Sequence, residues 1–360
     1  MIFGSRAPAC GDAAQEVCKP WSLAFDANVM GLVDVTSVQS IFNCPRCRSK
    51  LISAPAGFRC SSVECALHRR GAFPVIGRWP LLIDFERSIV GHREQPEAEA
   101  PVEAGPARRW SVQRLPKRLR SVCKPPNRVA ANNIDLLLSL LPGHSPMVLV
   151  VGGGTVGNGV EALYDDLRIR LVAFDIYRSP VTQFVADAHR IPLANESVDA
   201  VVVQAVLEHV LDPEKVVSEI HRVLRHGGLV YAETPFLQQV HAGPYDFTRY
   251  TSSGHRYLFR AFEEIRAGPV AGPGTQLLWS LDHIVRGLTR VELAGKIARG
   301  LFFWLRYLDH AVPVNFAMDS ASAFYFLGRR ASHELTPSEI LQYYRGAQSS
   351  AYASHEGEVI

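Results

Sequence analysis

Four short apolar segments recur along the middle of the chain, and stretches with a helical spacing of apolar residues separate them. The apolar segments are MVLVVG, RLVAFDI, SVDAVVVQ and GLVYAETP. The helical stretches include NNIDLLLSLLP before the first segment, GNGVEALYDD after it and DPEKVVSEIHRVLRHGG before the last. Buried parallel strands are near-continuous apolar runs, whereas a surface helix buries one stripe. The alternation predicts an α/β fold in which helices cover both faces of a parallel sheet.

The C-terminal part adds a long apolar segment and one more strand. Residues 276–312 are rich in Leu, Phe and Trp at helical spacing, and SAFYFLGRRA reads as the last strand. We interpret 276–312 as a helical insertion that packs on the sheet. Because Arg and Lys stand among its apolar residues, a lid over the site and a helix on a membrane surface are the alternatives. A polar tail is expected at 333–360.

The N-terminal part follows a different pattern, with little apolar periodicity. Residues 1–40 are expected to be a partly disordered lead-in with a short strand at GLVDVTSV, and 41–90 to be a small compact domain. The segment 91–106 is rich in Glu, Ala and Pro and reads as a linker. The larger α/β domain is expected at 107–332.

The small domain contains two cysteine pairs among the chain's 7 cysteines. Their spacings are C-x-x-C and C-x-x-x-x-C, and both occur in tetrahedral zinc sites, here Cys44, Cys47, Cys60 and Cys65. A segment this short cannot bury enough apolar surface to fold without a cross-link such as a bound metal ion or a disulfide. We therefore predict a zinc ion held by four thiolates, with His68 as an alternative to Cys65. Such a saturated ion has no open position for catalysis, so its role is structural or in substrate docking.

Composition and charge limit the function classes further. Hydrophobic residues make up 47% of the chain and the net charge is +3, which does not by itself indicate a nucleic-acid-binding protein. The sequence shows neither a secretory signal nor a long apolar span, so a cytoplasmic location is expected. A basic stretch suits phosphates of RNA, of a nucleotide sugar or of a lipid head group, or else a solvated helix face: Arg108, Arg109, Arg114, Lys117, Arg118, Arg120, Lys124 and Arg128.

A glycine cluster follows the first strand directly, in VLVVGGGTVGNG. Glycines at such a strand end let the main chain turn sharply and approach a nucleotide closely. Asp175 ends the second strand at about the usual offset for an acid that holds a ribose. Asp187 follows a short strand where an adenine amino group would lie, although a turn residue is the simpler interpretation.

Taken in order, these segments resemble a class I S-adenosylmethionine-dependent methyltransferase of the type 11 kind. The resemblance covers about residues 147–260 and is most typical in ADAHRIPLANESVDAVVVQAVLEHV followed by LRHGGLV. It implies a Rossmann-like seven-stranded sheet with an antiparallel final strand, and S-adenosylmethionine as the cofactor. The residues that it implies for the cofactor are Gly152 and Gly154 at the methionine and ribose, Asp175 at the ribose, Asp187 and Ala188 at the adenine, and Gln204 beside the sulfonium.

Two further features bear on this resemblance. Members of the family usually have an acid two residues before the first glycine, where this chain has Val150. That acid helps to hold the methionine amino group, so its replacement bears on cofactor affinity but not on the fold. GAFPVIGRWPLLI, at the end of the cysteine unit, resembles small zinc ribbons that accompany methyltransferases, including an activator of tRNA methyltransferases.

Residues for the chemistry are expected in two segments after the fourth and fifth strands. A hydroxyl acceptor needs a base to take its proton. His241 is the first candidate, and Asp246 either orients it, replaces it or forms a structural ion pair with Arg249. LEHV places Glu208 and His209 just after the fourth strand, and His209 either takes part as well, packs against the cofactor or caps the helix. The segment with His241 also resembles a motif of bacterial methyltransferases linked to cell-surface polysaccharides or natural products.

The sequence thus predicts a methyltransferase that acts on a small-molecule or glycan acceptor, possibly lipid-linked, with oxygen as the favoured accepting atom. One alternative is an RNA methyltransferase that docks RNA through the ribbon and the basic stretch. Another is a non-catalytic partner protein that has lost its cofactor, which only Val150 favours. Contact with a membrane surface remains a further expectation.

Overall fold

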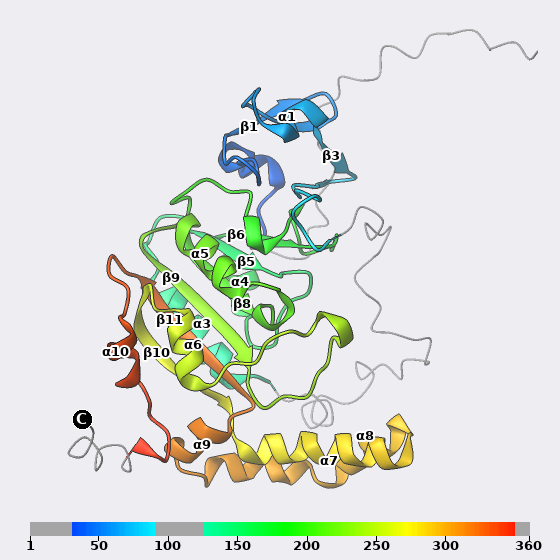
Figure 1. Ribbon diagram of the computed structural model, residues 1–360, viewed down its shortest axis with the longest axis vertical. Coiled ribbons are helices and arrows are strands. Elements are labelled where there is room, and N and C mark those ends of the chain that lie inside the picture. The colour runs from blue at the N-terminus through cyan, green and yellow to red at the C-terminus, as the bar shows by residue number, and fades with distance from the viewer. Residues whose placement is uncertain (1–30, 91–125, 350–360) are drawn as a thin grey trace, which may run out of the picture.

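Residues 31–90 and 126–349 are described by the computed structural model of the protein, and they form two sheets that pack together (Figure 1). The larger sheet has the order β10-β11-β9-β8-β5-β6-β7. Its strands are β5 (Met147–Val151), β6 (Arg170–Asp175), β7 (Phe184–Val185), β8 (Val198–Gln204), β9 (Leu224–Pro235), β10 (Phe262–Ala271) and β11 (Ala323–Arg330).

The direction of the strands agrees with the predicted methyltransferase sheet. Strands β5, β6, β7, β8 and β9 pair in parallel, whereas β11 runs antiparallel to both β9 and β10. Among the described residues the sheet therefore has seven strands, of which the last in the chain is antiparallel. This confirms the predicted fold class.

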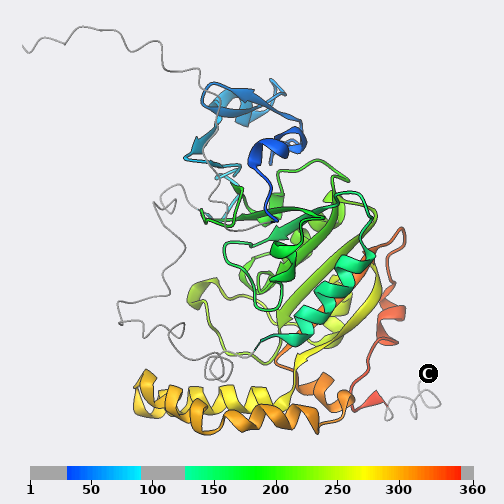
Figure 2. The ribbon, with the colours of Figure 1, turned by 180° about the vertical axis from the view of Figure 1, so that it is seen from behind.

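Helices cover both faces of the larger sheet, as the apolar pattern predicts. Alternate residues of β5 point to opposite faces: Val148 and Val150 pack with the first helices, and Leu149 and Val151 with the later ones. Figure 2 shows the first of these helices in front of the sheet. The first face carries α3 (Arg128–Leu140) and α4 (Ala162–Asp165), and the second carries α5 (Pro213–Val223) and α6 (Ser252–Leu258).

The cysteine unit is a small antiparallel sheet against the β7 edge of the larger one. Phe42 of the unit packs edge-on against Phe184 of β7, with ring centroids 5.3 Å apart, and Leu81 forms a bridge with Val185. The two sheets therefore share one core rather than lying apart. The unit's elements are η1 (Val35–Ser37), η2 (Gln39–Ile41), β1 (Leu51–Ala54), β2 (Gly57–Cys60), α1 (Ala66–Arg70), β3 (Phe73–Ile76) and β4 (Trp79–Pro80).

A helical hairpin lies between β10 and β11, beyond the carboxyl edge of the sheet (Figures 1 and 2). Its elements, together with the short helix that leads into β11, are α7 (Pro273–Thr289), α8 (Glu292–Leu301), η8 (Phe303–His310) and α9 (Val314–Ser320). Helices therefore occupy the segment 276–312, where the sequence predicts them. Within the described ranges, no helix has both the length and the apolar character needed to cross a membrane.

One local expectation was wrong, one helix is shorter than expected and one strand was not located in the sequence, each for a physical reason. GLVDVTSV is not a strand, because the Asp34 side chain caps a 3-10 helix and only Leu32 bridges to the sheet. The helix expected in GNGVEALYDD is a single turn, since glycines precede it and it ends at Asp165. Strand β10 was not expected, because FEEIRAGPVA lacks a clean alternation and its pairing has two register shifts.

The remaining elements are short, and several segments lie outside the described residues. The short elements are η5 (Ala188–Arg190), η6 (Leu207–His209), η7 (Gly243–Tyr245) and α10 (Pro337–Leu341), which begins with a capping box in the tail expected to be loose. Residues 1–30, the predicted linker 91–106 and the basic stretch except Arg128 are not described.

Candidate functional site

The glycine loop joins the end of β5 to α4 at the carboxyl edge of the sheet. Gly152 has a φ of 70°, in the left-handed region that favours glycine. A Cβ atom at Gly154 would collide with the hydroxyl group of Tyr177, and one at Gly152 with the side chain of Val206. A residue with a side chain would therefore not fit at either position, because neighbouring side chains already fill the space.

Asp175 lies beside this loop because β6 is the parallel neighbour of β5. Its Oδ2 accepts a hydrogen bond from the amide of Gly154 at 2.9 Å, and its Oδ1 accepts one from the amide of Ile176 at 2.7 Å. Burial raises the pKa of the Asp175 carboxyl to about 6. The arrangement places a carboxylate within reach of a ligand that rests on the glycine loop.

Asp187 and Ala188 lie at the next strand end, after β7. Asp187 Oδ1 accepts hydrogen bonds from the amide of His189 at 2.9 Å and from its ring Nδ1 at 2.6 Å. Its Oδ2 accepts one from the hydroxyl of Ser88 at 2.5 Å. The simpler interpretation of Asp187 as a turn residue therefore describes its contacts, and Ala188 beside it is buried. Ser88, from the cysteine unit, was not predicted here.

Gln204 ends β8 and belongs to a buried polar network. Its Nε2 donates to Oε2 of Glu233 at 2.7 Å, and Asn127 Nδ2 donates to both oxygens of that carboxylate at 3.1 Å. Burial raises the pKa of Glu233. Val150, where the family usually has an acid, is only 6% exposed and packs in the core.

His209 and His241 face each other across the same edge. Their Nε2 atoms are 3.1 Å apart, although the residues come from η6 and from the loop after β9. The Nδ1 of His209 donates to the carbonyl of Tyr245 at 2.7 Å, and the Nδ1 of His241 lies 3.4 Å from Oδ2 of Asp246. Each ring therefore turns its second nitrogen toward the other ring.

Asp246 makes both contacts that the sequence offered as alternatives, one with Arg249 and one with His241. It accepts hydrogen bonds from Arg249, one of them 2.7 Å long to Nη2, and from the amide of His241 at 3.0 Å. The Arg249 guanidinium holds the pKa of this carboxyl well below its usual range. The same carboxylate thus forms an ion pair that fixes the loop and lies against the His241 ring.

Glu208, which the segment LEHV places beside His209 after β8, is a further functional candidate. Its side chain is 1% exposed, and neither carboxylate oxygen has a hydrogen-bond partner among the described residues. Oε1 lies 3.7 Å from Nε2 of His209 and 3.9 Å from Nε2 of His241. Burial raises the pKa of Glu208 to about 7.

The four predicted zinc ligands converge in the cysteine unit. The sulfurs of Cys44 and Cys65 are 3.9 Å apart, those of Cys47 and Cys60 are 3.4 Å apart, and all four lie within 4.8 Å of one another. Zinc–sulfur bonds of about 2.3 Å at tetrahedral angles require separations of about 3.8 Å. His68 is not part of this group, because its Nδ1 lies 2.6 Å from the carbonyl oxygen of Cys60.

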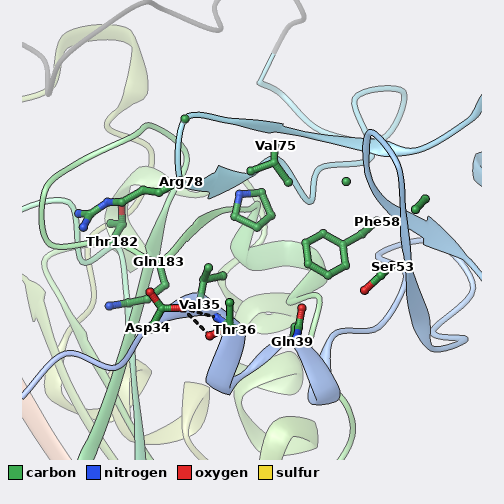
Figure 3. Close-up of a pocket in the computed structure, with 14 residues that line it drawn as sticks. Asp34, Val35, Thr36, Gln39, Ser53, Phe58, Val75, Arg78, Thr182 and Gln183 are labelled. Atoms are coloured by element: carbon green, nitrogen blue, oxygen red, sulfur yellow. Dashed lines mark hydrogen bonds between the residues drawn. The ribbon is translucent and has the colours of Figure 1, made fainter. Parts of the chain in front are cut away.

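A cavity of about 140 Å³ lies between the cysteine unit and the larger sheet (Figure 3). Phe58 and Val75 line it from the unit, and Thr182 and Gln183 from the segment before β7. The residues around it include none of the predicted cofactor, catalytic or metal-binding residues. The cavity is therefore separate from the carboxyl edge of the larger sheet, where the predicted cofactor and catalytic residues lie.

The chain is similar in sequence to known methyltransferases. A family model described as a methyltransferase domain matches residues 149–232. A demethylmenaquinone methyltransferase of Paenarthrobacter aurescens is 30% identical over 175 residues, which cover 43% of this chain and 67% of that protein. Another from Renibacterium salmoninarum is 30% identical over 149 residues, 36% of this chain and 62% of that protein.

A solved structure of a methyltransferase with a bound cofactor is weakly similar to this chain. The Haemonchus contortus phosphoethanolamine N-methyltransferase 2 in complex with S-adenosyl-L-methionine has a TM-score of 0.37 and 13% identity. The match covers 56% of this chain and 53% of that one. The fold assignment rests instead on the order and direction of the seven strands.

Proposed function

Because the chain belongs to the class I S-adenosylmethionine-dependent methyltransferases, we propose that it methylates an oxygen of a small-molecule or glycan acceptor that carries a lipid tail. The observation that carries this proposal is the sheet edge itself, where the glycine loop with Asp175 and the pair of His209 and His241 follow neighbouring strands. The first group suits the cofactor, and the second suits a hydroxyl group that must lose its proton.

The residues of the loop fit the cofactor in shape and chemistry. The loop places the main chain of Gly154 against the Asp175 carboxylate, which can accept hydrogen bonds from both ribose hydroxyls. We assign the adenine to Asp187 and Ala188, and the region beside the sulfonium to Gln204. S-adenosylmethionine supplies a methyl group on a cationic sulfur, which keeps the bonding electron pair as the new carbon–oxygen bond forms.

The histidine pair is where we propose that the acceptor hydroxyl lies and loses its proton to solvent. Tyr245 and Asp246 engage both Nδ1 atoms, so the Nε2 atoms of His209 and His241 are left to interact with the acceptor. Positioned side chains that assist such a proton transfer contribute about 100- to 10,000-fold in typical enzymes. A hydroxyl acceptor gains more from such groups than an amine does, which supports oxygen as the accepting atom.

The helical hairpin supports an acceptor with a lipid tail. Leu293, Ile297 and Leu301 follow one another at intervals of four along α8 and are 54–67% exposed, and Leu288 on α7 is 82% exposed. Basic residues stand among them: Arg286, Arg290, Lys296, Arg299 and Arg306. Apolar side chains mixed with cations suit the surface of an anionic membrane.

The hairpin is also connected to the acceptor site. Gln239, in the loop that carries His241, donates a hydrogen bond from Nε2 to the hydroxyl of Ser280 on α7 at 3.2 Å. A membrane that held the hairpin would therefore lie near the histidine pair. The demethylmenaquinone methyltransferases among the relatives are consistent with a small-molecule acceptor.

The cysteine unit completes the proposal with a structural zinc ion. Four sulfurs within 4.8 Å of one another match the tetrahedral spacing, and Cys44, Cys60 and Cys65 are buried. The ion would hold together a small sheet that shares its core with the catalytic sheet. It leaves no position for substrate, so its effect on catalysis would be through stability.

Asp175→Asn is expected to weaken the binding of S-adenosylmethionine by about 10- to 100-fold, because hydrogen bonds to a charged group contribute about 1.5–3 kcal/mol. The carboxyl group has a pKa of about 6, so the wild-type affinity should fall as the pH decreases through that value. Calorimetric titration between pH 5 and pH 8 measures both effects. Asp165→Asn, on an exposed aspartate, is the matched control. Equal affinity in the Asp175 variant would contradict the assignment.

The wild-type protein is expected to co-float with vesicles that contain phosphatidylglycerol, and less with vesicles of phosphatidylcholine alone. Each basic residue near an anionic surface contributes about 1 kcal/mol, and added salt should weaken the binding. Leu288→Ser combined with Leu293→Ser should reduce the bound fraction, whereas Leu167→Ser, which is exposed elsewhere, should not. If all variants float equally, or none does, the hairpin does not bind membranes.

A further inference from the structure

We propose that Glu208, His209 and His241 bind a divalent transition-metal ion at the acceptor end of the sheet. This inference deepens the proposed function and rests on it, because the ion would bind the acceptor's oxygen. One ligand atom from each residue lies within 4.8 Å of the others. The three residues come from two segments 32 positions apart that meet at the carboxyl edge of the sheet.

The two imidazoles are arranged as metal ligands usually are. In a neutral histidine one ring nitrogen carries the proton and the other has a lone pair. The carbonyl of Tyr245 and the carboxylate of Asp246 lie against the two Nδ1 atoms and favour the proton there. Both lone pairs then point at the same small space, and such outer partners are typical of metal-binding histidines. Without a cation, two lone pairs 3.1 Å apart would repel each other.

The third proposed ligand, Glu208, has a more unusual environment than the two histidines. The Glu208 carboxylate is almost fully buried, yet both oxygens lack a hydrogen-bond partner within the described ranges. A buried carboxylate without a partner is costly, so such groups are generally paired or coordinate metals. The nearby cation, Arg249, is already engaged with Asp246. An ion between Glu208 and the two histidines would satisfy all three side chains.

The separations of the ligand atoms suit zinc or a similar ion. Bonds of about 2.0–2.2 Å at tetrahedral angles place ligand atoms about 3.3–3.6 Å apart. The observed separations are 3.1 Å between the histidines, and 3.7 and 3.9 Å from Glu208 to each of them. Two histidines and one carboxylate leave a coordination position open, as in catalytic zinc sites.

The open position gives the ion a role in the proposed reaction. A hydroxyl oxygen bound there would lose its proton to solvent more easily, as water does on catalytic zinc. The resulting alkoxide or phenolate would form its bond to the methyl carbon as the carbon–sulfur bond breaks, and the sulfur would keep that electron pair. No electron is gained or lost by the ion, so zinc, which has no redox chemistry, is sufficient.

Zinc stoichiometry of the full-length protein tests this proposal. After equilibration with zinc and removal of excess metal by dialysis, the wild type should retain two ions per chain, one at the cysteines and one here. Glu208→Gln, which preserves shape, and His241→Ala should each retain one. Their affinity for the second ion should fall by at least about 100-fold, since even outer partners of metal ligands contribute 10- to 100-fold. His226→Ala, on an exposed imidazole, should retain two.

Cobalt substitution distinguishes the two sites. The cysteine site should show a thiolate-to-metal charge-transfer band, which the Glu208 and His241 variants keep while they lose the remaining visible absorption. If the wild type holds one ion only, at the cysteines, the histidines share a proton instead and the proposal is wrong. A second ion that survives in Glu208→Gln would also contradict it. Calorimetry with S-adenosylmethionine, done on the same samples, tests the proposed function separately, because either result can hold without the other.

Discussion

Replacing Cys44 with serine is expected to unfold the cysteine unit and to lower the free energy of unfolding of the whole chain by several kcal/mol. Cys44 is 1% exposed and lies with three other sulfurs at zinc-binding distance. Structural zinc contributes about 10–16 kcal/mol to the folding of small metal-dependent domains at neutral pH. Because Phe42 and Leu81 of the unit pack on β7, the loss should extend to the larger sheet.

Thermal unfolding and zinc content measure this effect together. Cys44→Ser should lose the tightly held ion and unfold at a markedly lower temperature, and a chelator should have the same effect on the wild type. Ser61→Ala, on an exposed side chain next to Cys60, should change neither quantity. A Cys44→Ser variant that keeps its zinc and its melting temperature would show that the four cysteines are ordinary core residues.

His241→Ala is expected to lower kcat by about 100- to 10,000-fold while the affinity for S-adenosylmethionine stays unchanged. The imidazole lies against His209 and Glu208 at the acceptor position, and its removal takes away a group that favours the deprotonated acceptor. Among the described residues, neither the glycine loop nor Asp175 is hydrogen-bonded to His241, so cofactor binding should be independent of it.

Turnover of the acceptor and calorimetric titration with the cofactor separate these two quantities. His226→Ala is a suitable control, because that exposed histidine lies at the beginning of β9, at the opposite end of the strand from the site. If His241→Ala keeps its kcat within a few-fold of the wild type, the histidine pair does not activate the acceptor. If it loses cofactor affinity as well, His241 acts through the fold and not on the acceptor.

The parts of this molecule that the sequence predicts well are those with local causes. The continuous apolar runs around Val148 and Val201 are typical of buried parallel strands. The number of residues from Gly152 to Asp175 follows from the βα unit between them. The spacing of the paired cysteines indicates a metal site from the sequence alone. In each case the residues involved are close in sequence or repeat a simple period.

The parts that the sequence did not predict depend on contacts between distant segments. Glu208 becomes notable only when the loop after β9 brings His241 to it, and Ser88 meets Asp187 from a separate sheet. Neither pairing has a local signal. Strand β10 is also held in place by its neighbour β11 and not by its own alternation. Burial without a partner, the decisive property of Glu208, can be seen only in three dimensions.

The central claim, that the glycine loop binds S-adenosylmethionine, is tested most directly by calorimetric titration of the zinc-loaded wild type with that cofactor, with S-adenosylhomocysteine and with NAD⁺. We expect one site with a Kd on the order of micromolar, about −8 kcal/mol, for the first two ligands and no binding of NAD⁺. The absence of binding to a folded, zinc-loaded protein would contradict the account and would mean that Val150 marks a site that has been lost.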